Sequence, residues 1–210
     1  MNRTSFCMVI FLFSIILLSA CRERHMPTDG GRLGDEVPGH VTASLSELMF
    51  QSLEQMRAME LTGDPDYDYA SLMVIHHQVG IAMTDYQIRR AQDTIQVEVS
   101  RDIQAVQERE LDYFSNYIHA VHPMPRNGAH LPELENFLQE FEEEKAAVDT
   151  KDDVEEDFPA LMILHNEKGI QLANLQMEHG RVEEVAAVAE ESANIKQSQI
   201  ETLEALQAGE

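Results

Sequence analysis

One segment of this chain occurs twice. Residues 68–84 read DYASLMVIHHQVGIAMT, and residues 157–173 read DFPALMILHNEKGIQLA. The two segments align without a gap at an offset of 89 residues. They share Met-x-x-His-x-x-x-Gly, which is carried by Met73, His76 and Gly80 and again by Met162, His165 and Gly169. A duplication of this kind predicts two related halves that pack about a pseudo-twofold axis.

Apolar residues recur at helical spacing almost throughout residues 44–208, and no segment alternates like a strand. In the first half, helices are expected at about 44–61, 66–91 and 94–121. In the second half, they are expected at about 132–148, 156–178 and 182–206. We therefore predict an all-α fold: a four-helix bundle made of two repeated helical hairpins, each preceded by a shorter helix. The repeat halves are about 45–121 and 132–208.

The N-terminal segment has the features of an export signal. Arg3 precedes the apolar run SFCMVIFLFSIILL, which is too short to span a membrane comfortably. Leu18-Ser19-Ala20-Cys21 resembles the bacterial lipobox. It predicts a lipoprotein signal peptide over residues 1–20 and lipidation of Cys21. An ordinary secretory signal with a chance cysteine is the alternative.

The predicted processing places the protein in the cell envelope. Removal of the signal takes away Cys7, and the lipid occupies Cys21, so the mature chain has no free thiol. Residues 21–43 are polar, rich in Gly and Pro, and are interpreted as a flexible tether. We expect membrane contact through the lipid anchor alone, on the periplasmic face if the cell is Gram-negative.

Charge and missing motifs exclude several function classes. The chain has 15 basic and 38 acidic residues, a formal net charge of −23, which argues against a nucleic-acid partner. It lacks the E-x-x-H, H-E-x-x-H and G-x-S-x-G patterns and has no Gly-rich phosphate loop. We therefore expect that it is not an enzyme.

One stripe of the helix at 66–91 carries unusual residues. At about 100° per residue, the positions that share a surface about 120° wide include Tyr69, Met73, His76, His77, Gly80, Met83 and Gln87. Thioether and imidazole are ligands suited to a soft ion such as Cu(I). A hydrogen-bonded core histidine, with Gln107 or Glu110 as its partner, is the alternative.

Further candidate ligands lie elsewhere in the chain. Met56 and Met59 are spaced to share a face of the first short helix. The second repeat offers Met162 and His165, although Asn166 and Leu172 replace a histidine and a methionine. Near the segment that joins the two repeat halves, His119, His122, Met124 and His130 predict a second metal site. An ordinary polar helix end is the alternative there.

The motif residues also resemble a known family. Thr62-Gly63-Asp64, Asp66, Asp68-Tyr69, Met73, His76-His77-Gln78, Gly80 and Met83 together resemble the bacterial domain-of-unknown-function family 305. The resemblance implies a ferritin-like helical fold, and some members are exported copper-binding proteins linked to copper resistance. It implies copper ligation at Met56, Met59, Met73, His76, His77 and Met83.

Two functional hypotheses follow. The first is a cell-envelope lipoprotein that binds copper as Cu(I), or Ag(I), for sequestration or resistance, with copper-handling envelope proteins as partners. The second is a helical interaction or structural module of the envelope that binds no metal. In the second case, the histidine–methionine stripe is ordinary core.

Overall fold

The computed structural model describes residues 43–209, and every described element is helical. The six helices are α1 (Leu45–Ala58), α2 (Pro65–Arg90), α3 (Thr94–Ala120), α4 (Leu131–Ala147), α5 (Val154–His179) and α6 (Glu183–Ala208). Within this range the all-α prediction is confirmed. The predicted signal peptide, the predicted lipidation site at Cys21 and nearly all of the predicted tether lie outside the described residues.

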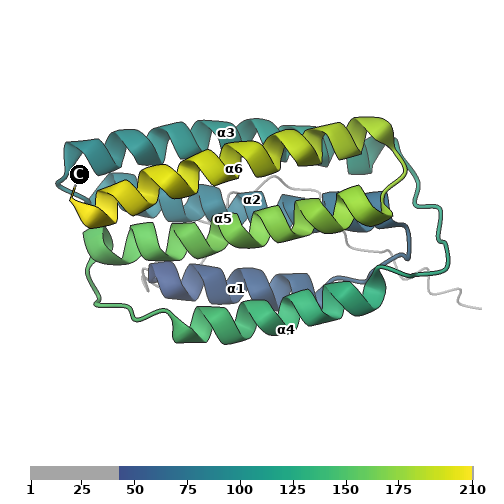
Figure 1. The fold of residues 1–210 in the computed structure, drawn as a ribbon, viewed down its shortest axis with the longest axis horizontal. Helices are drawn as coiled ribbons and strands as arrows, with labels where there is room; N and C mark the ends of the chain where they lie inside the picture. Colours follow the sequence, from purple (N-terminus) through teal and green to yellow (C-terminus); the bar gives the residue numbers. More distant parts are fainter. Residues whose placement is uncertain (1–42, 210) are drawn as a thin grey trace, which may run out of the picture. The chain divides into compact units, whose positions relative to one another are not determined.

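The helices form a bundle with an internal repeat (Figure 1). α2 and α5 pack on each other, and each pairs along its length with the helix that follows it, α3 or α6. The shorter α1 and α4 lie against each other and cover the other side of α2 and α5. The predicted ferritin-like four-helix bundle is therefore confirmed, with α1 and α4 as the short preceding helices.

Aspartate caps position three of the helices. The side chains of Asp64, Asp93 and Asp153 accept hydrogen bonds from the first backbone N–H groups of α2, α3 and α5. α1 begins after Ser44, which caps it through Glu47 N. α1 ends at Ala58, three residues before the predicted end, because Met59 has extended backbone angles (φ −69°, ψ 132°).

The acidic motif before α2 has a structural role. Asp68 is buried, and its carboxylate accepts hydrogen bonds from the backbone N–H groups of Thr62 and Gly63 at 2.7 and 3.0 Å. The same carboxylate lies 3.0 Å from Nε2 of His130, at the start of α4. Asp68 therefore holds the α1–α2 loop and the beginning of the second half together.

Asp66 makes a similar connection to the far end of the second hairpin. Its carboxylate accepts hydrogen bonds from Nε2 of Gln176 at 2.6 Å and from the backbone N–H groups of Arg181 and Val182. Because these groups lie at the end of α5 and the start of α6, Asp66 fixes the α5–α6 turn to the first turn of α2.

Buried apolar side chains from all six helices form one core. Its largest fully buried members include Phe114, Phe137, Phe141 and Phe158. Among the described helices, none combines the length and apolar character that crossing a bilayer requires.

Candidate metal centre

Three wholly buried histidines meet where α2 packs on α5. The rings of His76 and His165 are stacked, with centroids 3.8 Å apart and planes 5° apart. The ring of His77 stands edge-on to His76 at 5.3 Å. Because His76 and His165 are equivalent positions of the repeat, the pseudo-twofold axis passes between their rings.

The imidazole nitrogens in this centre have almost no hydrogen-bond partners. Both nitrogens of His76, Nδ1 of His77 and Nε2 of His165 are buried and have no partner among the described residues. The side-chain amide of Asn166 is also buried and unpaired. Each unsatisfied buried polar group costs about 1–3 kcal/mol, so a cluster of them indicates a site that binds something.

The hydrogen-bonded alternative predicted from the sequence is only partly realised. Nε2 of His77 lies 3.1 Å from Oε2 of Glu110, within ion-pair distance but without the alignment of a hydrogen bond. Gln107 instead donates its Nε2 hydrogen to Sδ of Met162 at 3.9 Å. The polar residues of α3 therefore engage Nε2 of His77 and leave both nitrogens of His76 without a partner among the described residues.

Burial keeps these imidazoles neutral. It lowers the pKa of His76 and of His165 well below the usual value, and the neighbouring imidazoles and Lys196 lower them further. The pKa of His77 is lowered less, because Glu110 opposes the effects of burial and Lys196. Neutral imidazole is the form that binds a metal, so no proton needs to leave before an ion enters.

A buried ion pair borders the three histidines. Nζ of Lys196 on α6 donates to Oε2 of Glu110 at 2.9 Å and to Oγ of Ser192 at 2.8 Å. Burial alone would raise the pKa of Glu110, but the contact with His77 and the Lys196 ammonium hold it at about 2. Burial lowers the pKa of Lys196, and Glu110 opposes this shift. The sequence interpretation missed Lys196, although the offset of 89 aligns it with Gln107.

The two repeat glycines make room for this arrangement. A Cβ on Gly80 would overlap the side-chain amide of Gln107. A Cβ on Gly169 would stand 2.6 Å from Cε of Lys196 and 2.8 Å from Nε2 of His76. The shared Gly of each repeat is therefore required where a side chain from α3 or α6 crosses the helix.

The predicted thioether ligands differ in their surroundings. Met73 and Met83 are wholly buried on the α2 side that carries His76, and Met162 is wholly buried on α5. Met56 is buried in α1, whereas Met59 is half-buried and lies past the helix end. The expected shared helical face of Met56 and Met59 is therefore not formed.

The motifs of this chain match a known family. The sequence model of a domain of unknown function, DUF305, matches residues 22–118 and 66–207. The chain belongs to this family. The two matches overlap and together span both halves of the repeat. No curated protein and no solved structure matches the chain.

In this DUF305 chain, the residues predicted for a second metal site do not converge. His122 and Met124 are exposed, and His119 uses Nδ1 to contact the backbone carbonyl of Ser115 at 2.6 Å. His130 is buried and pairs with Asp68. These side chains point to different partners, because the central loop turns His130 inward and leaves its neighbours in solvent.

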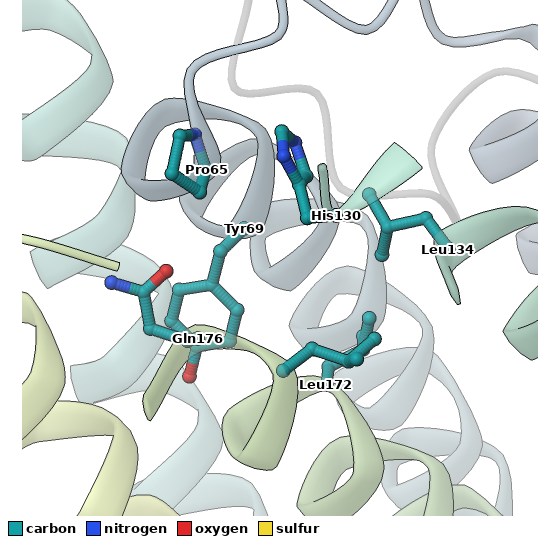
Figure 2. Close-up of a pocket in the computed structure, with 7 residues that line it drawn as sticks. Pro65, Tyr69, His130, Leu134, Leu172 and Gln176 are labelled. Carbon is teal, nitrogen blue, oxygen red and sulfur yellow. The ribbon is translucent and has the colours of Figure 1, made fainter. Parts of the chain in front are cut away.

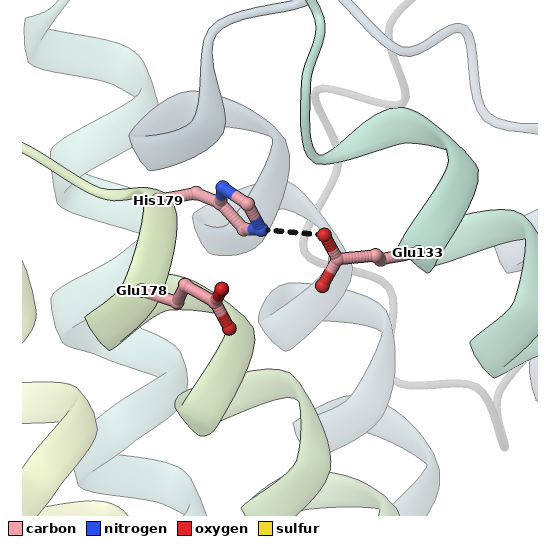
Figure 3. A group of neighbouring side chains, drawn as sticks. All are labelled: Glu133, Glu178 and His179. Carbon is pink, nitrogen blue, oxygen red and sulfur yellow. Dashed lines mark hydrogen bonds and ion pairs between the residues drawn. The ribbon is translucent and has the colours of Figure 1, made fainter.

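A different surface group combines ligand types. Glu133 of α4 and Glu178 and His179 of α5 each place one ligand atom within 4.8 Å of the others (Figure 3). Nε2 of His179 lies 3.0 Å from Oε1 of Glu133. The group is partly exposed and already contains an ion pair, so we assign it no ion. No sequence pattern predicted this group, because its residues come from two helices that are brought together only by the fold.

A small cavity lies between the first turns of α2 and α4 and the last turns of α5. It is lined by Pro65, Tyr69, His130, Leu134, Leu172, Leu175 and Gln176 (Figure 2). Its volume of about 10 Å³ is room for one water molecule. The hydroxyl of Tyr69 and Oε1 of Gln176 are buried without a partner among the described residues. This cavity is too small for an organic substrate.

Proposed function

We propose that this DUF305 protein is a cell-envelope lipoprotein that binds copper as Cu(I) for sequestration or resistance. The observation that carries the proposal is the set of four buried imidazole nitrogens without a partner among the described residues: both of His76, Nδ1 of His77 and Nε2 of His165. Buried polar groups in native proteins nearly always have partners, and a bound ion would supply one here. Met73, Met83 and Met162 are the thioether candidates that lie on the same two helices.

The ligand chemistry favours a soft monovalent ion. Imidazole and thioether are neutral donors, and thioether in particular favours Cu(I) and its analogue Ag(I) over hard cations. Within the described residues, the one carboxylate in contact with the centre, that of Glu110, is already paired with Lys196. The proposed role is binding rather than catalysis.

The proposed location depends on the N-terminal segment. A lipid on Cys21 would anchor the chain, and residues 21–43 would let the helical domain stand away from the membrane. Copper-handling proteins of the envelope are the proposed partners for delivery or removal of the ion.

A Cu(I) titration of the exported chain, residues 22–210, tests the proposal. The variant His76→Ala/His77→Ala should lose at least about 100-fold in Cu(I) affinity, because two ligands are removed from the centre. The matched control is His119→Ala/His122→Ala, which removes two exposed histidines and should bind like the wild type. Equal Cu(I) affinity of the wild type and the His76/His77 variant would contradict the proposal.

The melting temperature separates the proposal from the second hypothesis. If the domain is a metal-free interaction module, Ag(I) or Cu(I) has no native site and leaves the melting temperature unchanged. If the centre binds the ion, the melting temperature rises with free ion concentration by mass action. That rise should disappear in the His76/His77 variant and remain in the control.

A further inference from the structure

We propose that Lys196 makes the central site selective for monovalent over divalent ions; this inference rests on the proposed function. The repeat offset aligns Lys196 with Gln107, so the second half carries a cation where the first half carries a neutral amide. Both side chains cross a repeat glycine on the neighbouring helix, Gly80 for Gln107 and Gly169 for Lys196. Lysine in place of glutamine therefore gives the second half one positive charge that the first half lacks at the equivalent position.

The position of the ammonium group is fixed. Lys196 is only 1% exposed, and its Nζ donates to Glu110 and to Ser192 at 2.9 and 2.8 Å. Its Cε and Nε2 of His76 both lie within 2.8 Å of the point where a Cβ of Gly169 would stand. The lysine side chain therefore runs directly beside the His76 ring.

The charges around the centre sum to zero before an ion enters. The Glu110 carboxylate lies 2.9 Å from Nζ of Lys196 and 3.1 Å from Nε2 of His77, so one negative and one positive group stand against the histidines as a pair. An entering ion would be bound by neutral donors, attracted by the Glu110 carboxylate and repelled by the Lys196 ammonium, so Lys196 offsets the attraction that Glu110 alone would exert. This repulsion is proportional to the charge of the ion, so a divalent ion loses twice as much binding free energy as a monovalent one.

The variant Lys196→Gln tests this, because it copies the residue that the first half uses. We expect Ag(I) affinity to rise by at least about tenfold and Zn(II) affinity by about the square of that factor. At a separation of about 6 Å and an effective dielectric of about 20, one unit charge corresponds to roughly 100-fold in affinity. The measurement is isothermal titration of the exported chain with each ion separately.

Lys168→Gln is the matched control. Lys168 is also buried, and its Nζ pairs with Glu144 at 2.6 Å, on the side of α5 that faces α4. The control therefore removes a buried lysine, as the Lys196 variant does, but leaves the charge beside the three histidines unchanged. Both ions should bind the Lys168 variant as they bind the wild type.

Three results would overturn the inference. If the wild type binds Ag(I) but Lys196→Gln raises Zn(II) affinity no more than Ag(I) affinity, only the selectivity role of Lys196 fails. If the wild type binds no Ag(I), both this inference and the proposed function fail. If circular dichroism shows that Lys196→Gln does not fold, Lys196→Met removes the same charge, and equal gains for the two ions there also refute the role.

Discussion

At the residue scale, the central histidines make the stability of the folded protein depend on pH. Burial lowers the pKa of His76 and of His165 well below the value that each has in the unfolded chain. The unfolded chain therefore binds more protons than the folded chain below about pH 6.5. The free energy of unfolding of the metal-free protein is therefore highest above about pH 6.5, and it decreases as the pH falls through and below this value.

His76→Asn should reduce this dependence. Each such histidine contributes a slope of about 1.4 kcal/mol per pH unit in the free energy of unfolding below about pH 6.5. Removing His76 should lower the total slope between pH 6.5 and 5 by about that amount, measured by urea denaturation of metal-free protein. His122→Asn, which changes an exposed histidine, should leave the slope unaltered. Parallel curves for wild type and His76→Asn would contradict the assignment of a buried neutral imidazole.

Gly80→Ala tests the crossing of Gln107 over α2. The new methyl group would overlap the Gln107 amide, so we expect a loss of about 1–3 kcal/mol in the free energy of unfolding. The loss should be smaller when Gln107→Ala is already present, because the crowding partner is gone. A double-mutant cycle measures this difference. Additive effects of the two changes would show that Gly80 is not required for this contact.

At the element scale, helix positions follow from sequence more readily than helix contacts. Apolar periodicity predicted helices from about residue 44 and residue 66, within one residue of where α1 and α2 begin, because that signal is local. The end of α1 was placed too late, since Met59 leaves the helix while still packing on the core. Local patterns place a helix, but they do not report how its last residues pack.

The candidate site shows the same limit. His76, His77 and His165 were predicted from the repeated motif, and the structure brings them together. Lys196 was not predicted, because its part in the centre depends on how α6 lies across Gly169 of α5. The four residues predicted for a second metal site do not converge, because the buried His130 ring pairs with Asp68, which lies sixty-two residues away in the sequence.

Asp66 tests how the two halves are held together at the helix ends. Asp66→Ala would leave the Gln176 amide and the backbone N–H groups of Arg181 and Val182 without their acceptor. We expect a loss of about 2–4 kcal/mol in the free energy of unfolding, measured by urea denaturation. Asp85→Ala removes an exposed i,i+4 partner of Arg89 and should cost less than about 0.5 kcal/mol. Equal small losses would contradict a structural role for the acidic motif.

At the scale of the whole molecule, the duplication yields one centre rather than two. His76 and His165 come from different halves and stack on the pseudo-twofold axis. Around them, the first half supplies His77, Gln107 and Glu110, and the equivalent positions of the second half in sequence are Asn166, Lys196 and Gln199. The two halves differ in the charge and in the side-chain type at these positions, and the single centre takes residues from both. We therefore expect one ion per chain.

The most direct test is to crystallise residues 22–210 with Ag(I) and to locate silver by anomalous diffraction. The account predicts one strong peak per chain between α2 and α5, within bonding distance of an imidazole nitrogen of His76, His77 or His165. A peak only at exposed residues such as His122, or no ordered silver at saturating Ag(I), would contradict it.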